Sequence, residues 1–324
     1  MGTDDVAGDL IGALDELVAR YRTDADEGLL QDLVDLRHRA AMEFEPQARE
    51  PWPPEYGDLF PGQDGVPEVA AGDLTAEVMG SAIAHHGSLV VRGLFDDDMV
   101  ARTAESLNRA RDVWRSGPKN WFGPHYEPTI GLDLGTEVLR RQVRDLGGIW
   151  LADSASATQQ VLDDLERAGA LAMIAEHFGE RPVFSLQKST LRRVSPVYRF
   201  TSYHQDGSFL GPETRALNVW IAFTACGGDR SAPGLELVPA RVEEILETDP
   251  TLGRAAIDGW LVHRVAGDAG KVVPTFDPGD ALLFDEHLVH RTHVTEGMLE
   301  PRLALECWFF APSHPNDEYV PLLV

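Results

Sequence analysis

Apolar residues recur every three or four positions in the first part of the chain. One stripe runs from Leu10 to Tyr21, and a second begins at Leu29 after a short polar stretch. This spacing predicts two amphipathic helices joined by a turn. We expect residues 1–45 to form a helical extension that packs on the rest of the chain, or on a second copy of it in a homodimer formed through these helices.

The pattern changes between Glu45 and Pro67, where prolines and glycines crowd together. Proline fixes φ and lacks a backbone donor, so this stretch favours irregular, extended chain. We therefore expect a linker over 46–70 and one main domain over 71–324. The first part of that domain is predicted to be helical over 74–86, 96–114 and 157–178, with a short apolar strand at 88–91.

From Val183 onward, short β-branched and aromatic runs alternate with Gly/Pro turns, which is typical of antiparallel strands. The predicted strands cover residues 183–194, 216–224, 235–238, 271–276, 281–284 and 303–310. The fold class is therefore α+β with a mainly β core. We expect a double-stranded β-helix, that is, a cupin-like jelly roll with flanking helices, whose mouth can enclose a small-molecule site.

Composition and charge exclude several classes of partner. Of the 324 residues, 43% are hydrophobic and 25% are charged, which is ordinary globular usage. The 53 acidic and 28 basic residues give a net charge of -25, which repels nucleic acid and anionic membranes. The two cysteines lack CxxC spacing, and neither an export signal nor a run of about 18 apolar residues occurs, so we expect a soluble, cytoplasmic protein.

The candidate chemistry centres on the sequence Tyr-His-Gln-Asp-Gly at 203–207. Side chains at i and i+2 of an extended strand share a face, so His204 and Asp206 can converge on one ion while Gln205 points away. An HxD triplet arises by chance in many proteins, so by itself it is weak evidence for a metal site. A third ligand elsewhere in the chain would strengthen that evidence. A histidine from the distant segment 280–292 would complete two imidazoles and one carboxylate.

Such a ligand set occupies one face of an octahedron and leaves the opposite face for a chelating co-substrate and dioxygen, as in non-haem Fe(II) oxygenases. Zinc could use the same ligand types. Its structural sites, however, are closed, and its catalytic sites usually bind a single water or substrate atom.

Several short segments support this interpretation by their order and spacing. They are Tyr-His-Gln-Asp-Gly at 203–207, Asn-Val-Trp-Ile-Ala at 218–222, Pro-Gly-Leu-Glu-Leu-Val-Pro at 233–239, Pro-Gly-Asp-Ala-Leu-Leu-Phe at 278–284, Leu-Val-His-Arg-Thr at 288–292 and Pro-Arg-Leu-Ala-Leu at 301–305. In this set the chain resembles the phytanoyl-CoA dioxygenase family of Fe(II)/2-oxoglutarate-dependent oxygenases. It departs from the family at 238–242, where Val-Pro-Ala-Arg-Val replaces the common Val-Pro-Gly-Ser-His, so the substrate contacts of that loop are in doubt.

The resemblance implies a role for each matching residue. His204, Asp206 and His290 would hold the iron and form the catalytic centre. Arg302 would grip the distal carboxylate of 2-oxoglutarate with help from Thr292, and a guanidinium fork suits that carboxylate.

Two assignments have competitors. His287 and His293 each lie three residues from His290, but the family pattern of two apolar residues, His, small residue or Arg, then Ser/Thr fits only Leu-Val-His-Arg-Thr at 288–292. The resemblance also implies that the strand before the HxD triplet contributes a further polar residue to 2-oxoglutarate. Gln187 and Lys188 point to opposite faces there, and Lys188 is the one we expect.

The resemblance further implies Fe(II), 2-oxoglutarate and O2 as cofactors, and hydroxylation of a small-molecule metabolite with release of succinate and CO2. Asp206 favours hydroxylation over halogenation, because related halogenases replace this carboxylate by a small residue. Desaturation, cyclisation and epimerisation use the same ligands and stay open.

Two other kinds of function are alternatives. One is a non-catalytic cupin-like module that binds a metal or ligand, and it would be expected to lack a ligand or the arginine. The other is a zinc or manganese metalloenzyme with the same triad. Arg302 and Thr292 argue against it, because such an enzyme has no need of a dicarboxylate clamp.

Two weaker signals lie outside these motifs. The aromatic segment 114–126 is interrupted by Gly and Pro, and is either a lid over the site or core packing. Arg192, Arg193 and Arg199 form a basic cluster that either recognises an anionic substrate or forms ion pairs with the many carboxylates.

Overall fold

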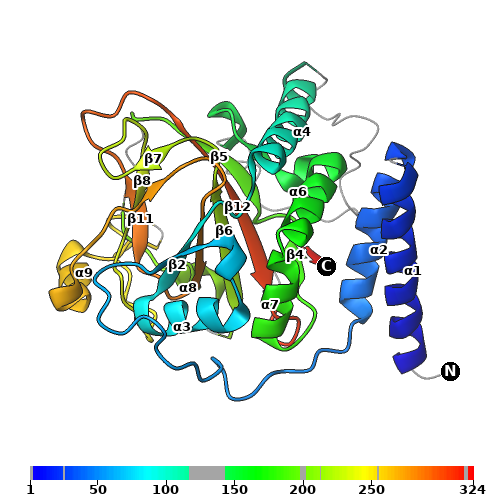
Figure 1. Ribbon diagram of the computed structural model, residues 1–324, viewed down its shortest axis with the longest axis horizontal. Helices are drawn as coiled ribbons and strands as arrows, with labels where there is room; N and C mark the ends of the chain where they lie inside the picture. The colour runs from blue at the N-terminus through cyan, green and yellow to red at the C-terminus, as the bar shows by residue number, and fades with distance from the viewer. Residues whose placement is uncertain are drawn as a thin grey trace.

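The computed structural model describes residues 3–24, 26–116, 143–197, 202–211, 213–253, 255–316 and 320–324. Most of the aromatic segment 114–126, predicted as a lid or as core packing, lies outside these ranges, as does Arg199. Figure 1 shows a large central sheet with helices on one side, small sheets at one end and a helical hairpin at the other. In the described ranges, no helix combines the length and apolar composition needed to cross a membrane.

The two N-terminal helices that the periodicity predicts are present. They are α1 (Thr3–Asp24) and α2 (Leu30–Glu43), joined by the 3-10 turn η1 (Glu27–Leu29). Hydrogen bonds fasten α2 to the last strand, since Arg37 Nη1 donates to the Leu323 carbonyl at 2.9 Å and His38 Nδ1 lies 3.0 Å from the Pro321 carbonyl. The hairpin therefore packs on the rest of the chain, while the domain boundaries and the homodimer stay predictions.

The predicted linker is irregular but anchored. Glu50 forms an ion pair with Arg215 at 2.7 Å, and the Arg215 guanidinium lies 4.8 Å from the ring centroid of Trp52. The last three residues of the range, Glu68–Ala70, form the short strand β1, parallel to β2 (Ser88–Arg92). Side-chain contacts with the main domain, and not regular backbone hydrogen bonds, thus hold most of this segment in place.

The main domain begins with helices whose ends carry typical caps. They are α3 (Ala76–His86), α4 (Asp97–Ser116), α6 (Ala155–Arg167) and α7 (Ala170–Phe178), with 3-10 turns η2 (Ala71–Asp73) and η4 (Leu151–Asp153). Thr75 and Ser154 accept hydrogen bonds from the first turns of α3 and α6. The single helix predicted over 157–178 was wrong, because Gly169 at φ 75° separates α6 from α7.

The central sheet has nine strands in the described part of the chain. The strands not yet given are β3 (Ile149–Trp150), β4 (Val183–Ser185), β5 (Thr190–Val194), β6 (Ala216–Ala222), β10 (Ala281–Asp285), β12 (Arg302–Phe310) and β13 (Pro321–Leu323). The order is β1-β2-β10-β6-β12-β4-β13, with β5 pairing both β12 and β3, and every pair except β1 with β2 is antiparallel. The strand predicted over 183–194 is interrupted by a turn between β4 and β5.

Two small sheets lie beyond the large one. They pair β8 (Gly234–Leu237) with β11 (His290–His293), and β7 (Cys226–Gly227) with β9 (Thr275–Phe276). Most of the strand predicted over 271–276 is absent, since only β9 forms there. The remaining elements are α8 (Gly207–Leu210), α9 (Gly259–Ala266) and the turn η5 (Gly267–Ala269).

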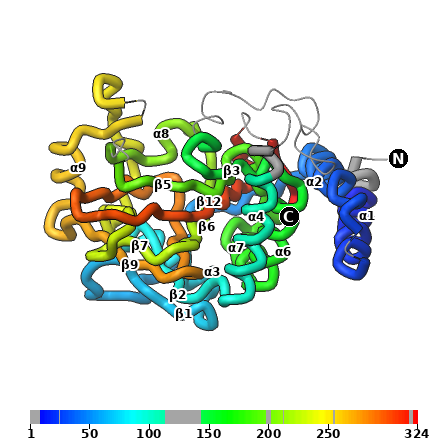
Figure 2. The backbone as a smooth tube through the Cα atoms, turned by 90° about the horizontal axis from the view of Figure 1, so that it is seen from above, coloured from blue at the N-terminus to red at the C-terminus, as the bar shows by residue number. Residues whose placement is uncertain are grey.

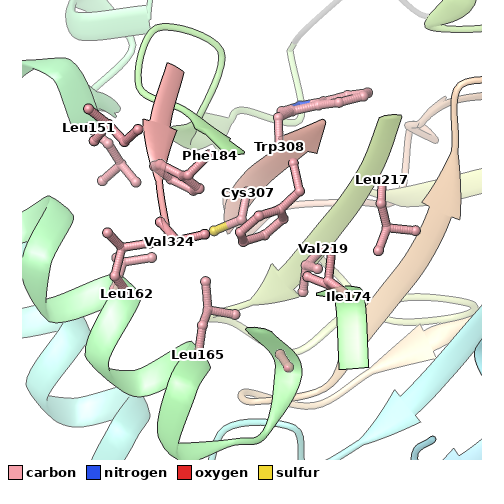
Figure 3. Close-up of a cluster of buried hydrophobic side chains, with 14 of the residues drawn as sticks. Leu151, Leu162, Leu165, Ile174, Phe184, Leu217, Val219, Cys307, Trp308 and Val324 are labelled. Atoms are coloured by element: carbon pink, nitrogen blue, oxygen red, sulfur yellow. The ribbon is translucent and has the colours of Figure 1, made fainter. Parts of the chain in front are cut away.

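Apolar side chains fill both faces of the central sheet. On one face, Leu162, Leu165 and Ile174 of α6 and α7 point toward Phe184, Val219 and Cys307 of the sheet (Figure 3). On the other, Trp220, Phe284 and Ala304 form a second cluster with Leu235 and Leu237 of β8. The architecture is thus a mixed α/β fold with a large sheet, and the second face carries the candidate site.

Candidate metal centre

The backbone brings the HxD motif against the start of β11. His204 and His290 form an antiparallel bridge in which each backbone N–H donates to the carbonyl of the other at 3.0 Å. Asp206 has φ -65° and ψ -28° and sits at the N-terminus of α8, so it is not on an extended strand as the sequence predicted. A turn into a short helix, rather than the pleat of a strand, therefore directs its carboxylate toward the histidines.

The three predicted ligands meet at one point. One ligand atom each from His204, Asp206 and His290 lies within 4.8 Å of the others. His290 Nε2 is 3.8 Å from Asp206 Oδ2, and the two imidazole centroids are 4.3 Å apart. Asp206 and His290 are buried, so the carboxylate and ring face each other away from bulk water.

Hydrogen bonds on the far side of each ring leave Nε2 for a metal. His204 Nδ1 lies 3.2 Å from the Ser202 carbonyl, and His290 Nδ1 lies 3.0 Å from the Leu288 carbonyl. With its proton on Nδ1, each ring would donate to that carbonyl and direct Nε2 toward a metal. Burial, with the nearby His290 as a second cause, lowers the pKa of His204 to about 4, so its ring is neutral at pH 7.

The competing histidines lie elsewhere. His287 Nδ1 contacts the Val242 carbonyl at 3.1 Å, and its Nε2 lies 3.5 Å from Glu286 Oε1. His293 pairs with Gly234 at the far end of β11. Among the described residues, only His204, Asp206 and His290 form a group able to hold a metal ion.

Arg302 and Thr292 both adjoin the start of β8. Arg302 is buried on β12 and its Nη1 donates to the Gly234 carbonyl at 2.7 Å. Thr292 lies on β11 opposite Leu235, the next residue of β8. The guanidinium and the hydroxyl-bearing residue predicted to bind one carboxylate thus border the same corner of the site.

Trp220 joins this corner, although the sequence analysis gave it no role. The Arg302 guanidinium lies 5.4 Å from the centroid of its ring. The indole is buried, and its Nε1 has no hydrogen-bond partner among the residues that the structure describes. A buried indole N–H usually finds an acceptor, so this donor is suited to a ligand oxygen. The only feature of the sequence that could have indicated a role for Trp220 is its position in the segment 218–222, which matches the family.

The structure separates Gln187 from Lys188. Gln187 Oε1 accepts from the backbone N–H of Val320 at 2.8 Å and so faces the C-terminal segment. The Lys188 ammonium lies 4.5 Å from the Phe209 ring centroid and 4.7 Å from that of Trp308. Burial lowers the pKa of Lys188, and the negative charge of Asp206 opposes that shift. Of the two residues, Lys188 is therefore the one that points toward Phe209 of α8, the short helix that follows Asp206.

In the described part of the basic cluster before the motif, Arg192 forms an ion pair. Arg192 Nη1 lies 3.2 Å from Glu306 Oε1, and Thr190 Oγ1 lies 3.5 Å from the other oxygen of that carboxylate. Arg193 is exposed on β5.

Comparisons with known proteins show which proteins this chain is similar to. The 1-deoxypentalenic acid 11-beta-hydroxylase of Streptomyces arenae is 26% identical over 220 residues, covering 64% of this chain and 70% of that protein. The enzyme of the same name from Streptomyces exfoliatus is 24% identical over 225 residues, with the same coverage. The crystal structure of EctD from S. alaskensis with 2-oxoglutarate and 5-hydroxyectoine has a similar fold, with a TM-score of 0.55, 18% identity and coverage of 83% of this chain and 87% of that one.

Residues 83–297 match the phytanoyl-CoA dioxygenase (PhyH) family. The match spans more than half of the 324 residues and includes His204, Asp206, His290 and Thr292, but it ends before Arg302. The chain therefore belongs to the phytanoyl-CoA dioxygenase (PhyH) family of 2-oxoglutarate-dependent non-haem iron oxygenases.

Proposed function

We propose that this oxygenase hydroxylates a small-molecule metabolite at an iron held by His204, Asp206 and His290, with release of succinate and CO2. The observation that carries the proposal is the convergence of one nitrogen from each of two imidazoles and one oxygen of a buried carboxylate within 4.8 Å. In each imidazole Nδ1 lies beside a backbone carbonyl, and a set of two imidazoles and one carboxylate suits Fe(II).

The co-substrate is proposed to bind with its distal carboxylate at Arg302, Thr292 and Trp220. The guanidinium, the hydroxyl and the indole N–H together offer donors from β12, β11 and β6 to one carboxylate. Lys188 is proposed to approach the other end of the co-substrate, because its ammonium lies over the ring of Phe209, in the short helix that follows Asp206.

Fe(II) with 2-oxoglutarate supplies the power to oxidise an unactivated C–H bond with O2. The chain supplies geometry and exclusion of water. Phe284 packs its ring 5.1 Å from that of His290, and Trp308 and Phe209 enclose the Lys188 ammonium. These apolar contacts hold the ligands in place and keep bulk water from one side of the centre.

The finer fold proposal is a double-stranded β-helix. The antiparallel strands β10, β6, β12 and β5 would form one wall, and the pair β8–β11 would form part of the other. The cluster of Trp220, Leu235 and Phe284 between these sheets supports such a two-walled core.

Hydroxylation is favoured over halogenation because the carboxylate of Asp206 takes part in the triad. The two relatives are named as hydroxylases of 1-deoxypentalenic acid, which makes this acid the first compound to test as a substrate. A zinc or manganese enzyme with the same triad would leave the buried Arg302 and Trp220 without a purpose.

Anaerobic absorption spectroscopy tests the proposal. Purified metal-free protein is titrated with Fe(II) and 2-oxoglutarate, and a visible charge-transfer band that requires both additions is expected. His204→Ala should abolish the band, and Arg302→Ala should require more 2-oxoglutarate to reach it. Iron binding without any band would exclude 2-oxoglutarate as co-substrate. The alternative of a zinc or manganese metalloenzyme with the same triad would then be favoured.

A further inference from the structure

Gln205 stands between the two ligands of the HxD motif, and its buried side chain is fully hydrogen-bonded to backbone groups. Its Nε2 donates to the carbonyl oxygens of His287 at 2.8 Å and Glu244 at 3.1 Å. Its Oε1 accepts from the backbone N–H of Leu246 at 2.8 Å. A side-chain amide has two donors, so both are in use, and 0% of the residue is exposed.

The bond to His287 connects the two segments that carry the ligands. His287 lies three residues before His290, at the turn that leads into β11. Two further ties join the same segments, since Gly207 N–H donates to the Glu286 carbonyl at 2.9 Å and His204 pairs with His290. Of these ties, only that of Gln205 is made by a side chain, so a substitution can remove it while the backbone stays intact.

The other two bonds hold the segment 241–246 behind the motif. This segment has neither helix nor strand, so its backbone groups rely on partners from outside it. It packs closely, because a Cβ on Gly207 would lie 2.4 Å from Ile245 Cδ1. His287 Nδ1 also contacts the Val242 carbonyl at 3.1 Å. Gln205 is thus the point at which the motif, the turn before β11 and the segment 241–246 meet.

We propose that Gln205 is a positioning residue of the metal centre, which fixes the separation between the His204–Asp206 pair and His290 and thereby sets the affinity for Fe(II). The inference rests on the proposed function only in requiring that the triad binds a metal ion. Groups that orient metal ligands typically change metal affinity about 10- to 100-fold when they are removed.

A matched pair of substitutions tests this role. Gln205→Met keeps the side-chain length and removes all three hydrogen bonds. Gln187→Met is the control, because Gln187 is also buried and bonded to backbone, through Val320 N–H, but faces away from the triad. Both variants should melt at lower temperature than wild type. Only Gln205→Met should raise the Fe(II) dissociation constant about 10- to 100-fold, measured anaerobically by chelator competition at a temperature where circular dichroism shows both variants folded.

Gln205→Glu provides a second test if Gln205→Met does not fold. It keeps the volume and the acceptor for Leu246 N–H, but a carboxylate cannot donate to the His287 carbonyl, so it should also bind Fe(II) more weakly than wild type. A folded Gln205 variant whose affinity stays within about twofold of wild type, well short of tenfold, would make Gln205 a folding residue only and overturn the proposal. Wild-type protein that binds no Fe(II) would instead overturn the proposed function itself.

Discussion

Trp220 and Arg302 share a buried corner in which a carboxylate would meet donors from two strands. The indole Nε1 has no partner among the described residues, while Arg302 already donates to the Gly234 carbonyl. An unsatisfied buried donor costs stability in the ligand-free protein and is compensated when an acceptor arrives. In the proposed co-substrate site the two residues would differ in role, since Arg302 would supply a positive charge and Trp220 an N–H donor without another partner among the described residues.

Trp220→Phe should weaken 2-oxoglutarate binding and leave iron binding intact. The change removes the indole N–H but keeps an aromatic ring beside Arg302 and Phe276. A hydrogen bond to a charged group contributes about 1.5–3 kcal/mol, so the 2-oxoglutarate dissociation constant should rise about 10- to 100-fold. Titration of the Fe(II)-loaded, oxygen-free protein measures it, and an unchanged constant would exclude Trp220 from the co-substrate site.

The sequence could identify the triad because order and spacing are visible in a chain. His204, Asp206 and His290 appear in segments whose neighbours match a family pattern, and the structure brings all three together. Trp220 and Gln205 were not identified as functional residues, because their roles depend on partners distant in the sequence. The orphaned donor of Trp220 and the contacts of Gln205 with Glu244 and His287 exist only in the folded chain.

Helices and strands were predicted well where apolar residues keep the same spacing along the whole element. They were predicted less well where a single residue interrupts that spacing. Gly169 divides the predicted helix over 157–178, since its positive φ is compatible with a cap and not with helix. The strand over 271–276 is reduced to β9, because its partner β7 offers only two residues for pairing. Strand length depends on the neighbouring strand, which the local sequence does not specify.

The packing of α7 against the linker buries a histidine whose protonation opposes folding. The Nδ1 atom of His177 lies 3.0 Å from the Tyr56 hydroxyl oxygen, and the His177 ring centroid is 5.3 Å from that of Trp52. Burial lowers the pKa of His177 from 6.5 to about 4. The folded protein therefore excludes a proton that the unfolded chain binds. The stability contributed by the neutral His177 is complete above pH 6.5 and decreases as the pH falls from 6.5 to 4.

His177→Gln should flatten this pH dependence while keeping a polar group for Tyr56. Between pH 6.5 and 4, the free energy of unfolding of the metal-free variant should fall less steeply than that of wild type, by up to one proton or about 1.4 kcal/mol per pH unit. Urea unfolding at several pH values, with a chelator present, gives both slopes. Parallel slopes for the two proteins would show that His177 is protonated in the folded state.

At the scale of the whole molecule, the N-terminal hairpin and the metal centre lie at opposite ends. Figures 1 and 2 place α1 and α2 at one end and α9, near β8 and β11 in Figure 1, at the other. The apolar residues of the hairpin are buried within the same chain, because Leu14, Leu30 and Leu33 belong to the core shared with α6 and the central sheet. The hairpin is therefore expected to contribute to folding stability and not to the chemistry of the site.

Leu33→Ala should separate these two properties. Leu33 is 1% exposed on α2, so truncation leaves a cavity and should lower the free energy of unfolding by about 2–5 kcal/mol. Met42→Ala on the same helix is the control, because Met42 is 65% exposed, and its effect should stay within about 0.5 kcal/mol. Sites far apart without shared partners act independently, so both variants should bind Fe(II) with wild-type affinity when titrated below their melting temperatures. Weaker Fe(II) binding by folded Leu33→Ala would instead reveal coupling along the central sheet, and would give the hairpin a regulatory role in place of a purely structural one.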